Sequence, residues 1–181
     1  MTPLKGKLLI AEPFLNDPNF DRSVVFLCQH NANGSLGFVF NQATSLTLSD
    51  VIEDTYSELP LHTGGPVEPN TLHFIHRLGT EIDESVLVGN GIYWSGNFEQ
   101  LKTLLNVGRL TAQDIRFFVG YSGWAAGQLL REMKQKTWIV ADADAPLLFD
   151  TPTPALWREV LKRKGGEYRS KAHYPTDPRL N

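Results

Sequence analysis

The chain has 181 residues, of which 41% are hydrophobic and 20% are charged, and its formal net charge is −3. This composition predicts one soluble domain, residues 1–181, with a substantial core. No apolar run approaches the roughly 20 residues that cross a bilayer, and the first residues are too polar for a signal peptide, so we expect a cytoplasmic protein without a membrane partner. The single cysteine, Cys28, excludes an internal disulfide and a cysteine-rich metal site, and predicts a buried thiol.

Eight short runs, rich in β-branched or aromatic residues and bounded by turn residues, predict strands at 7–11, 23–29, 36–40, 71–75, 85–88, 91–95, 115–121 and 137–140. Helical patterns with capping residues predict helices at 48–53, 98–106, 124–134 and 153–164. Residues 166–181 show no periodicity, so we expect an irregular tail.

Charge is distributed unevenly along the chain. Residues 158–181 hold seven Lys or Arg against three acids, whereas residues 1–157 hold ten against seventeen. Such a basic tail could attract phosphate or DNA, but nucleic-acid-binding domains are usually basic overall. The alternative is a solvated helix face whose positive end suits the helix dipole. We therefore rank direct DNA binding below a protein partner.

Residues 120–129, GYSGWAAGQL, place glycines and aromatics at the predicted junction of a strand and a helix. The hydrolase motif G-x-S-x-G does not fit, because Trp124 stands where that motif needs its last glycine. Tyr121 and Trp124 flank glycines at a strand end, where the backbone can approach a ligand or partner closely. Core packing is the alternative for both aromatics.

Two further loops stand out in the first half of the chain. Asn31-Ala32-Asn33-Gly34 predicts a hairpin turn that brings His30 towards the start of the returning strand. Gly64 and Gly65 leave backbone N–H groups uncovered, so that loop either binds an anion or makes a tight turn under close packing.

The order of these motifs resembles the AlgH/YqgE family of bacterial proteins over nearly the whole chain. The residues that carry the resemblance are Gly6 to Ala11, Asp17-Pro18-Asn19-Phe20, Arg22 to Val25, His30, Gly34 to Asn41, Gly64 to Val67, Gly120 to Trp124, Gly127-Gln128-Leu129, Trp138 and Phe149-Asp150-Thr151. The resemblance implies a single α+β domain with a bifurcated, mostly antiparallel β-sheet, partly closed into a barrel and surrounded by helices. It implies no agreed activity, cofactor or ligand, and one branch is described as a regulator of alginate production.

The chain departs from the family pattern in two places. Gln42-Ala43 stands where the family usually has Arg or Lys followed by Pro, which removes a positive charge and a rigid turn. Ser122 stands where the family more often has Ala, so we interpret this serine as an incidental small residue.

Catalytic and metal-binding sets find little support in the sequence. Ser122 could be combined with any of five histidines and several aspartates, but such combinations arise readily by chance. His73 and His76 lie three apart in a predicted strand and would face opposite sides. We therefore expect no catalytic residue, no metal and no cofactor.

The leading hypothesis is a non-catalytic binding protein or transcriptional regulatory protein with an unknown protein or small-molecule partner. Its binding surface would combine charge, amide groups and aromatic area from Arg22, His30, Asn41, Gly64, Gly65, Tyr121, Trp124 and Gln128. The alternative is an enzyme that acts on a small phosphate- or carboxylate-bearing molecule.

Overall fold

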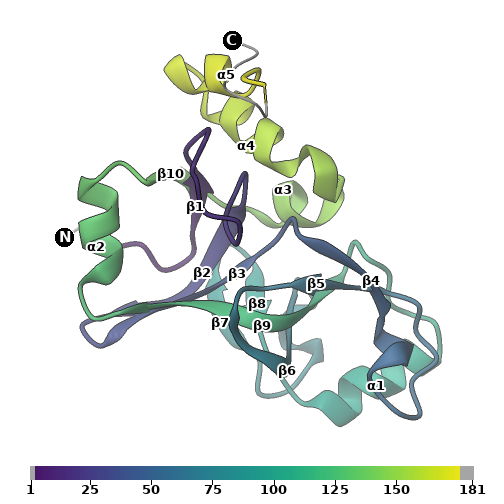
Figure 1. The fold of residues 1–181 in the computed structure, drawn as a ribbon. Helices are drawn as coiled ribbons and strands as arrows, with labels where there is room; N and C mark the ends of the chain where they lie inside the picture. The colour runs from purple at the N-terminus through teal and green to yellow at the C-terminus, as the bar shows by residue number, and fades with distance from the viewer. Residues whose placement is uncertain (1–2, 176–181) are drawn as a thin grey trace.

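A computed structural model describes residues 3–175 (Figure 1). Its strands are β1 Lys7–Ala11, β2 Val24–Asn31, β3 Gly34–Val39, β4 Ala43–Thr47, β5 Pro60–Thr63, β6 Val67–His76, β7 Val86–Gly89, β8 Ile92–Trp94, β9 Ile115–Ala125 and β10 Trp138–Asp142. Its α-helices are α1 Phe98–Asn106, α2 Gln128–Lys134, α3 Ala145–Asp150, α4 Leu156–Lys164 and α5 Glu167–Lys171. Short 3₁₀ helices lie between these elements: η1 Leu48–Asp50, η2 Gly79–Glu81 and η3 Thr153–Ala155.

The strands form one curled, mostly antiparallel sheet in the order β10-β1-β2-β3-β9-β6-β8-β7. The long strand β9 pairs with β6 along one edge. Its other edge is shared, because β5 pairs with residues 117–119 in parallel and β3 pairs with residues 122–125 antiparallel. The sheet therefore forks at Gly120, which confirms the bifurcated α+β fold expected from the sequence.

The fork explains the paired glycines. A Cβ atom on Gly64 would lie 2.4 Å from the carbonyl oxygen of Gly120, and one on Gly65 would lie 2.3 Å from the carbonyl carbon of Tyr121. Gly120 itself has a φ of +69°. Only glycine allows three backbone segments to meet this closely, so the structure favours the tight-packing interpretation of the Gly64-Gly65 loop.

Both faces of the sheet are buried over much of its area. Alternate residues of β1 show this, because Leu8 and Ile10 face the inner cluster, whereas Leu9 and Ala11 face an outer one. Helices α3 and α4 close the inner face, α2 covers the outer face at one end of the sheet, and α1 covers it at the other (Figure 1). The curl brings β7 back towards β1, since a Cβ on Gly6 would lie 3.3 Å from the Val88 oxygen.

Several element boundaries differ from the sequence predictions. Strand β1 and helix α1 have the predicted bounds, but β4, β5 and α3 were not predicted. Helix α2 begins only at Gln128, because β9 continues to Ala125 while its last residues pair with β3. The predicted helix at 48–53 is a single 3₁₀ turn.

The expectation of an irregular tail after residue 166 is wrong for its first part, where Glu167–Lys171 form α5 against α4. Residues 176–181 of that tail lie outside the described residues. No helix in the described part of the chain is long and apolar enough to cross a membrane.

Candidate functional site

The residues predicted to form one binding surface are distributed over two faces of the sheet. Tyr121 packs against the inner cluster and lies 5.8 Å from His73, measured between ring centroids. Trp124, three residues later in the same strand, belongs to the outer cluster beneath α2 and is 6% exposed. Strand parity places the two aromatic side chains on opposite faces of β9, although both residues line one open hollow of about 540 Å³ together with Ser35 and Val67.

Arg22 and Asn41 lie together at the strand ends near α4. The Asn41 side chain accepts a hydrogen bond from the Val24 N–H and donates one to the Arg22 carbonyl oxygen, both at 2.9 Å. The Arg22 guanidinium lies 4.5 Å from the Trp157 ring centroid and donates to the Tyr174 carbonyl oxygen. These contacts hold the fold together and engage both polar groups of Asn41.

His30 and Gln128 also bond within the protein. His30 Nδ1 lies 2.7 Å from Ser35 Oγ, in the hairpin that the sequence predicted. Gln128 accepts from the Ala125 N–H and donates to Glu132. The Glu132 carboxylate in turn accepts from the indole N–H groups of Trp124 and Trp138. The motif residues here build a network beneath α2.

Ser122, the serine of the segment 120–129, is fully buried and donates to the Gly64 carbonyl oxygen at 2.9 Å. It therefore reinforces the fork. Within residues 3–175 no group of three or more His, Cys, Asp or Glu side chains is placed to hold a metal ion.

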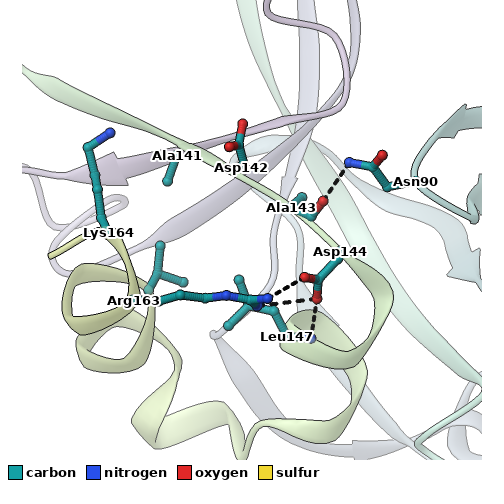
Figure 2. Close-up of a pocket in the computed structure, with 9 residues that line it drawn as sticks. Asn90, Ala141, Asp142, Ala143, Asp144, Leu147, Arg163 and Lys164 are labelled. Atoms are coloured by element: carbon teal, nitrogen blue, oxygen red, sulfur yellow. Dashed lines mark hydrogen bonds and ion pairs between the residues drawn. The ribbon is translucent and has the colours of Figure 1, made fainter.

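A hollow of about 830 Å³ lies between β10 and α4. Figure 2 shows Arg163 reaching across it to Asp144, and Asn90 donating to the Ala143 carbonyl oxygen. Asp142 pairs with Lys7, and Lys164 donates to the Val140 carbonyl oxygen. Because its charged groups already have partners, this hollow offers little to a ligand.

A smaller pocket of about 310 Å³, which we call the Arg116 pocket, lies where β5 and β9 meet the junction of α3 and η3. The parallel pairing of His62 with Phe118 places Arg116 and His62 on the same face of the sheet. The pocket is lined by Ala43, Leu59, Pro60, His62, Ala112, Ile115, Arg116, Phe149, Asp150, Thr151, Pro152 and Thr153.

Arg116 is a buried cation without a carboxylate partner among residues 3–175. It is 7% exposed, and its one hydrogen bond runs from Nη1 to the Leu148 carbonyl oxygen at 3.2 Å. The Phe40 and Phe149 rings lie 5.2 and 5.9 Å from its guanidinium carbon. Burial lowers its pKa from the ordinary arginine value to about 10, so it stays charged at neutral pH. Its remaining N–H groups are available to an anion.

His62 is 3% exposed, and its Nδ1 atom has no hydrogen-bond partner in the part of the chain that the structure describes. Its Nε2 lies 3.5 Å from Thr153 Oγ1, at the limit of a hydrogen bond. Burial and then the charge of Arg116 lower its pKa from 6.5 to about 4, against the opposing effect of the Phe117 and Pro60 carbonyls. The imidazole is therefore neutral at pH 7, with a buried polar atom unsatisfied.

The outer wall of the pocket is held in place by an ion pair. Arg77 bonds Asp150 at 2.8 Å and lies 5.7 Å from the Phe149 ring centroid. Thr153 begins η3, which runs directly into α4. The positive end of this helical segment thus lies at the pocket and adds to the field of Arg116.

The sequence contains a signal for this pocket outside the motifs described above. Arg116 is the one charged residue in the otherwise apolar run 115–119. A lone charge in a strand buried on both faces marks a group whose desolvation must be offset. His62, one of the five possible bases for Ser122 in the sequence, makes no hydrogen bond with that serine: Ser122 donates to the Gly64 carbonyl oxygen, and His62 Nε2 lies 3.5 Å from Thr153 Oγ1.

The comparison with known families agrees with this architecture. The AlgH-like family model matches residues 8–169. The chain belongs to the AlgH-like family. A UPF0301 protein of Cytophaga hutchinsonii is 44% identical over 179 residues, covering 98% of each chain. One of Chlorobium limicola is 42% identical over 179 residues, covering 97% of this chain and 95% of the relative.

Solved structures of two AlgH-like folds superpose on the model. The solution structure of the AlgH protein from Pseudomonas aeruginosa has a TM-score of 0.75 and 28% identity, and the match covers 97% of each chain. A crystal structure of a Corynebacterium diphtheriae protein has a TM-score of 0.81 at 20% identity, with 96% and 94% coverage, and so supports the fold alone. The family predicted from the motifs is confirmed.

Proposed function

We propose that this AlgH-like chain is a binding protein for a small molecule that carries a phosphate or a carboxylate group, held in the Arg116 pocket. The observation that carries the proposal is the buried guanidinium of Arg116, which has one hydrogen bond and no carboxylate partner within residues 3–175, beside the unsatisfied Nδ1 of His62. An unpaired buried charge is costly, and an anion would offset that cost.

Binding is favoured over the alternative, an enzyme acting on the same class of molecule. His62 is the only histidine that lines the Arg116 pocket. Its pKa of about 4 makes it a weak proton acceptor at neutral pH, whereas efficient general bases have pKa values near the working pH. The same neutral imidazole suits a hydrogen bond to a bound anion.

We extend the proposal to regulation in the cytoplasm. A ligand on Arg116 would bridge β5, β9 and the segment Phe149–Thr153, which are far apart in sequence. Ligand occupancy would thereby stabilise that segment, and a protein partner that contacts it would respond to the ligand. The regulatory role of one branch of the family is compatible with this scheme.

Thermal unfolding with added anions tests the proposal. Ligand at 100 times its Kd adds about 2.7 kcal/mol, which raises the Tm of a chain of this size by roughly 5–10 °C. Phosphate and carboxylate compounds that bind the pocket should raise the Tm of the wild type and of Arg163→Met, which removes a cation from the larger hollow. Arg116→Met should abolish the response. An equal response in Arg116→Met would refute the pocket as the site.

A further inference from the structure

The charges around the Arg116 pocket match a single negative charge. Arg116 supplies one fixed positive charge, and the neighbouring imidazole of His62 is neutral at pH 7. The second charged lining residue is Asp150, an acid, whose positive partner Arg77 does not line the pocket. Because the Asp150 charge is balanced by Arg77, a dianion such as a phosphate monoester would bring one negative charge more than Arg116 neutralises.

The remaining lining is largely apolar. Leu59, Pro60, Ile115, Phe149 and Pro152 contribute hydrocarbon surface around the two polar groups. Burying such surface against a ligand removes it from water and stabilises the complex. A ligand with an apolar body therefore gains binding free energy from contact with these walls. Inorganic phosphate and acetate have too little apolar surface to do so.

The volume sets an upper limit on the size of that body. About 310 Å³ lies at the low end of the roughly 300–1,000 Å³ typical of small-molecule sites. Phe149, which lines the pocket, is 3% exposed, and its ring centroid lies 5.9 and 5.7 Å from the guanidinium carbons of Arg116 and Arg77. The space suits one ring or a short branched chain better than a nucleotide.

We propose that the ligand of the Arg116 pocket is a small monocarboxylate with an apolar body, its carboxylate bonded by Arg116 and His62 and its body packed on Phe149. This inference rests on the proposed function and narrows its ligand class. The Arg116 fork donates two parallel N–H bonds to a carboxylate, which is the geometry that such pairs prefer. The His62 imidazole donates a third hydrogen bond from Nδ1, the ring nitrogen that has no hydrogen-bond partner within residues 3–175.

Calorimetric titration with four probes tests the inference: phenylacetate, acetate, phenylacetamide and inorganic phosphate. Phenylacetate should bind the wild type at least tenfold more tightly than acetate or phosphate, because only it offers both charge and apolar surface. Phenylacetamide has the same shape without the charge and should bind at least tenfold more weakly than phenylacetate.

Variants connect the titrations to the pocket. Arg116→Met should remove phenylacetate binding, and Arg116→Lys, which keeps the charge but loses the fork, should retain part of it. Ala112 is an exposed lining residue. Ala112→Glu should weaken phenylacetate binding several-fold more than Ala112→Gln does, since the two variants differ only in charge. Arg163→Met, outside the pocket, controls for a general loss of positive charge.

The possible results separate this inference from the proposed function. If phosphate binds as tightly as phenylacetate, or acetate as tightly as phenylacetate, and both depend on Arg116, the monocarboxylate inference is overturned and the anion-binding function stands. If no probe binds in an Arg116-dependent way to folded protein, both are overturned.

Discussion

Replacing Arg116 by methionine should leave the protein as stable as the wild type or make it slightly more stable. The fall in the Arg116 pKa from its ordinary value to about 10 corresponds to roughly 3 kcal/mol against the buried charged form. The substitution would lose the contacts with the Phe40 and Phe149 rings, worth about 1 kcal/mol, and the bond to the Leu148 oxygen, worth about 1–2 kcal/mol. The expected net change in unfolding free energy is a gain of about 0–1 kcal/mol.

Urea unfolding followed by tryptophan fluorescence measures this change, with equal m-values required for the comparison. Arg77→Met is the matched control, because its guanidinium is paired with Asp150 on the protein surface and its loss should cost about 0.5–1 kcal/mol. A loss of more than about 2 kcal/mol for Arg116→Met would show that Arg116 holds the fold together. The argument for an anion site would then lose its basis.

Two other substitutions test the roles of polar side chains in the fold. The pKa of His62 is about 4 in the folded chain and 6.5 in the unfolded chain, so the unfolded chain binds a proton first as the pH falls. The free energy of unfolding should therefore fall by up to about 3 kcal/mol between pH 6.5 and 4. Urea midpoints at pH 7 and pH 4.5 should show a shallower fall for His62→Gln than for the exposed-site control His173→Gln; equal falls would contradict this account. Asn41→Ala should lower the free energy of unfolding by about 2 kcal/mol in chemical denaturation, because it leaves the buried Val24 N–H unpaired. Unchanged stability would contradict a structural role for the Asn41 amide and would again favour a role in ligand binding.

Local patterns in the sequence predicted the elements that depend on local interactions. Strand β1 and helix α1 were predicted with their observed bounds, since alternation and the Asn97 cap are encoded within a few residues. Trp124 was assigned to a helix because glycines and helix formers follow it. Its pairing with Ser35, about 90 residues away in sequence, keeps it in β9 instead. Tyr121 and Trp124 thus flank glycines within one continuous strand, where their side chains take opposite faces.

The Arg116 pocket could not be predicted from local patterns. It depends on the parallel pairing of β5 with β9 and on the position of α3. Neither β5 nor α3 is predicted by the sequence pattern. Tertiary pairing of this kind overrides propensity in short strands. The signal in the sequence was Arg116 within an apolar run, which indicates that a buried charge exists but not what surrounds it.

The fork at Gly120 has a consequence for synthesis of the chain. Strands β3, β5 and β6 all pair with β9, so the first 114 residues of a nascent chain lack the strand that joins them. Until residues 115–125 leave the ribosome, three strands each expose an unpaired backbone edge, which invites association with other chains. Chaperone binding to nascent chains should therefore be strongest just before β9 emerges and should decline once it has docked. A chain cut anywhere before β9 should be unable to fold, because neither arm of the sheet can close without its shared strand.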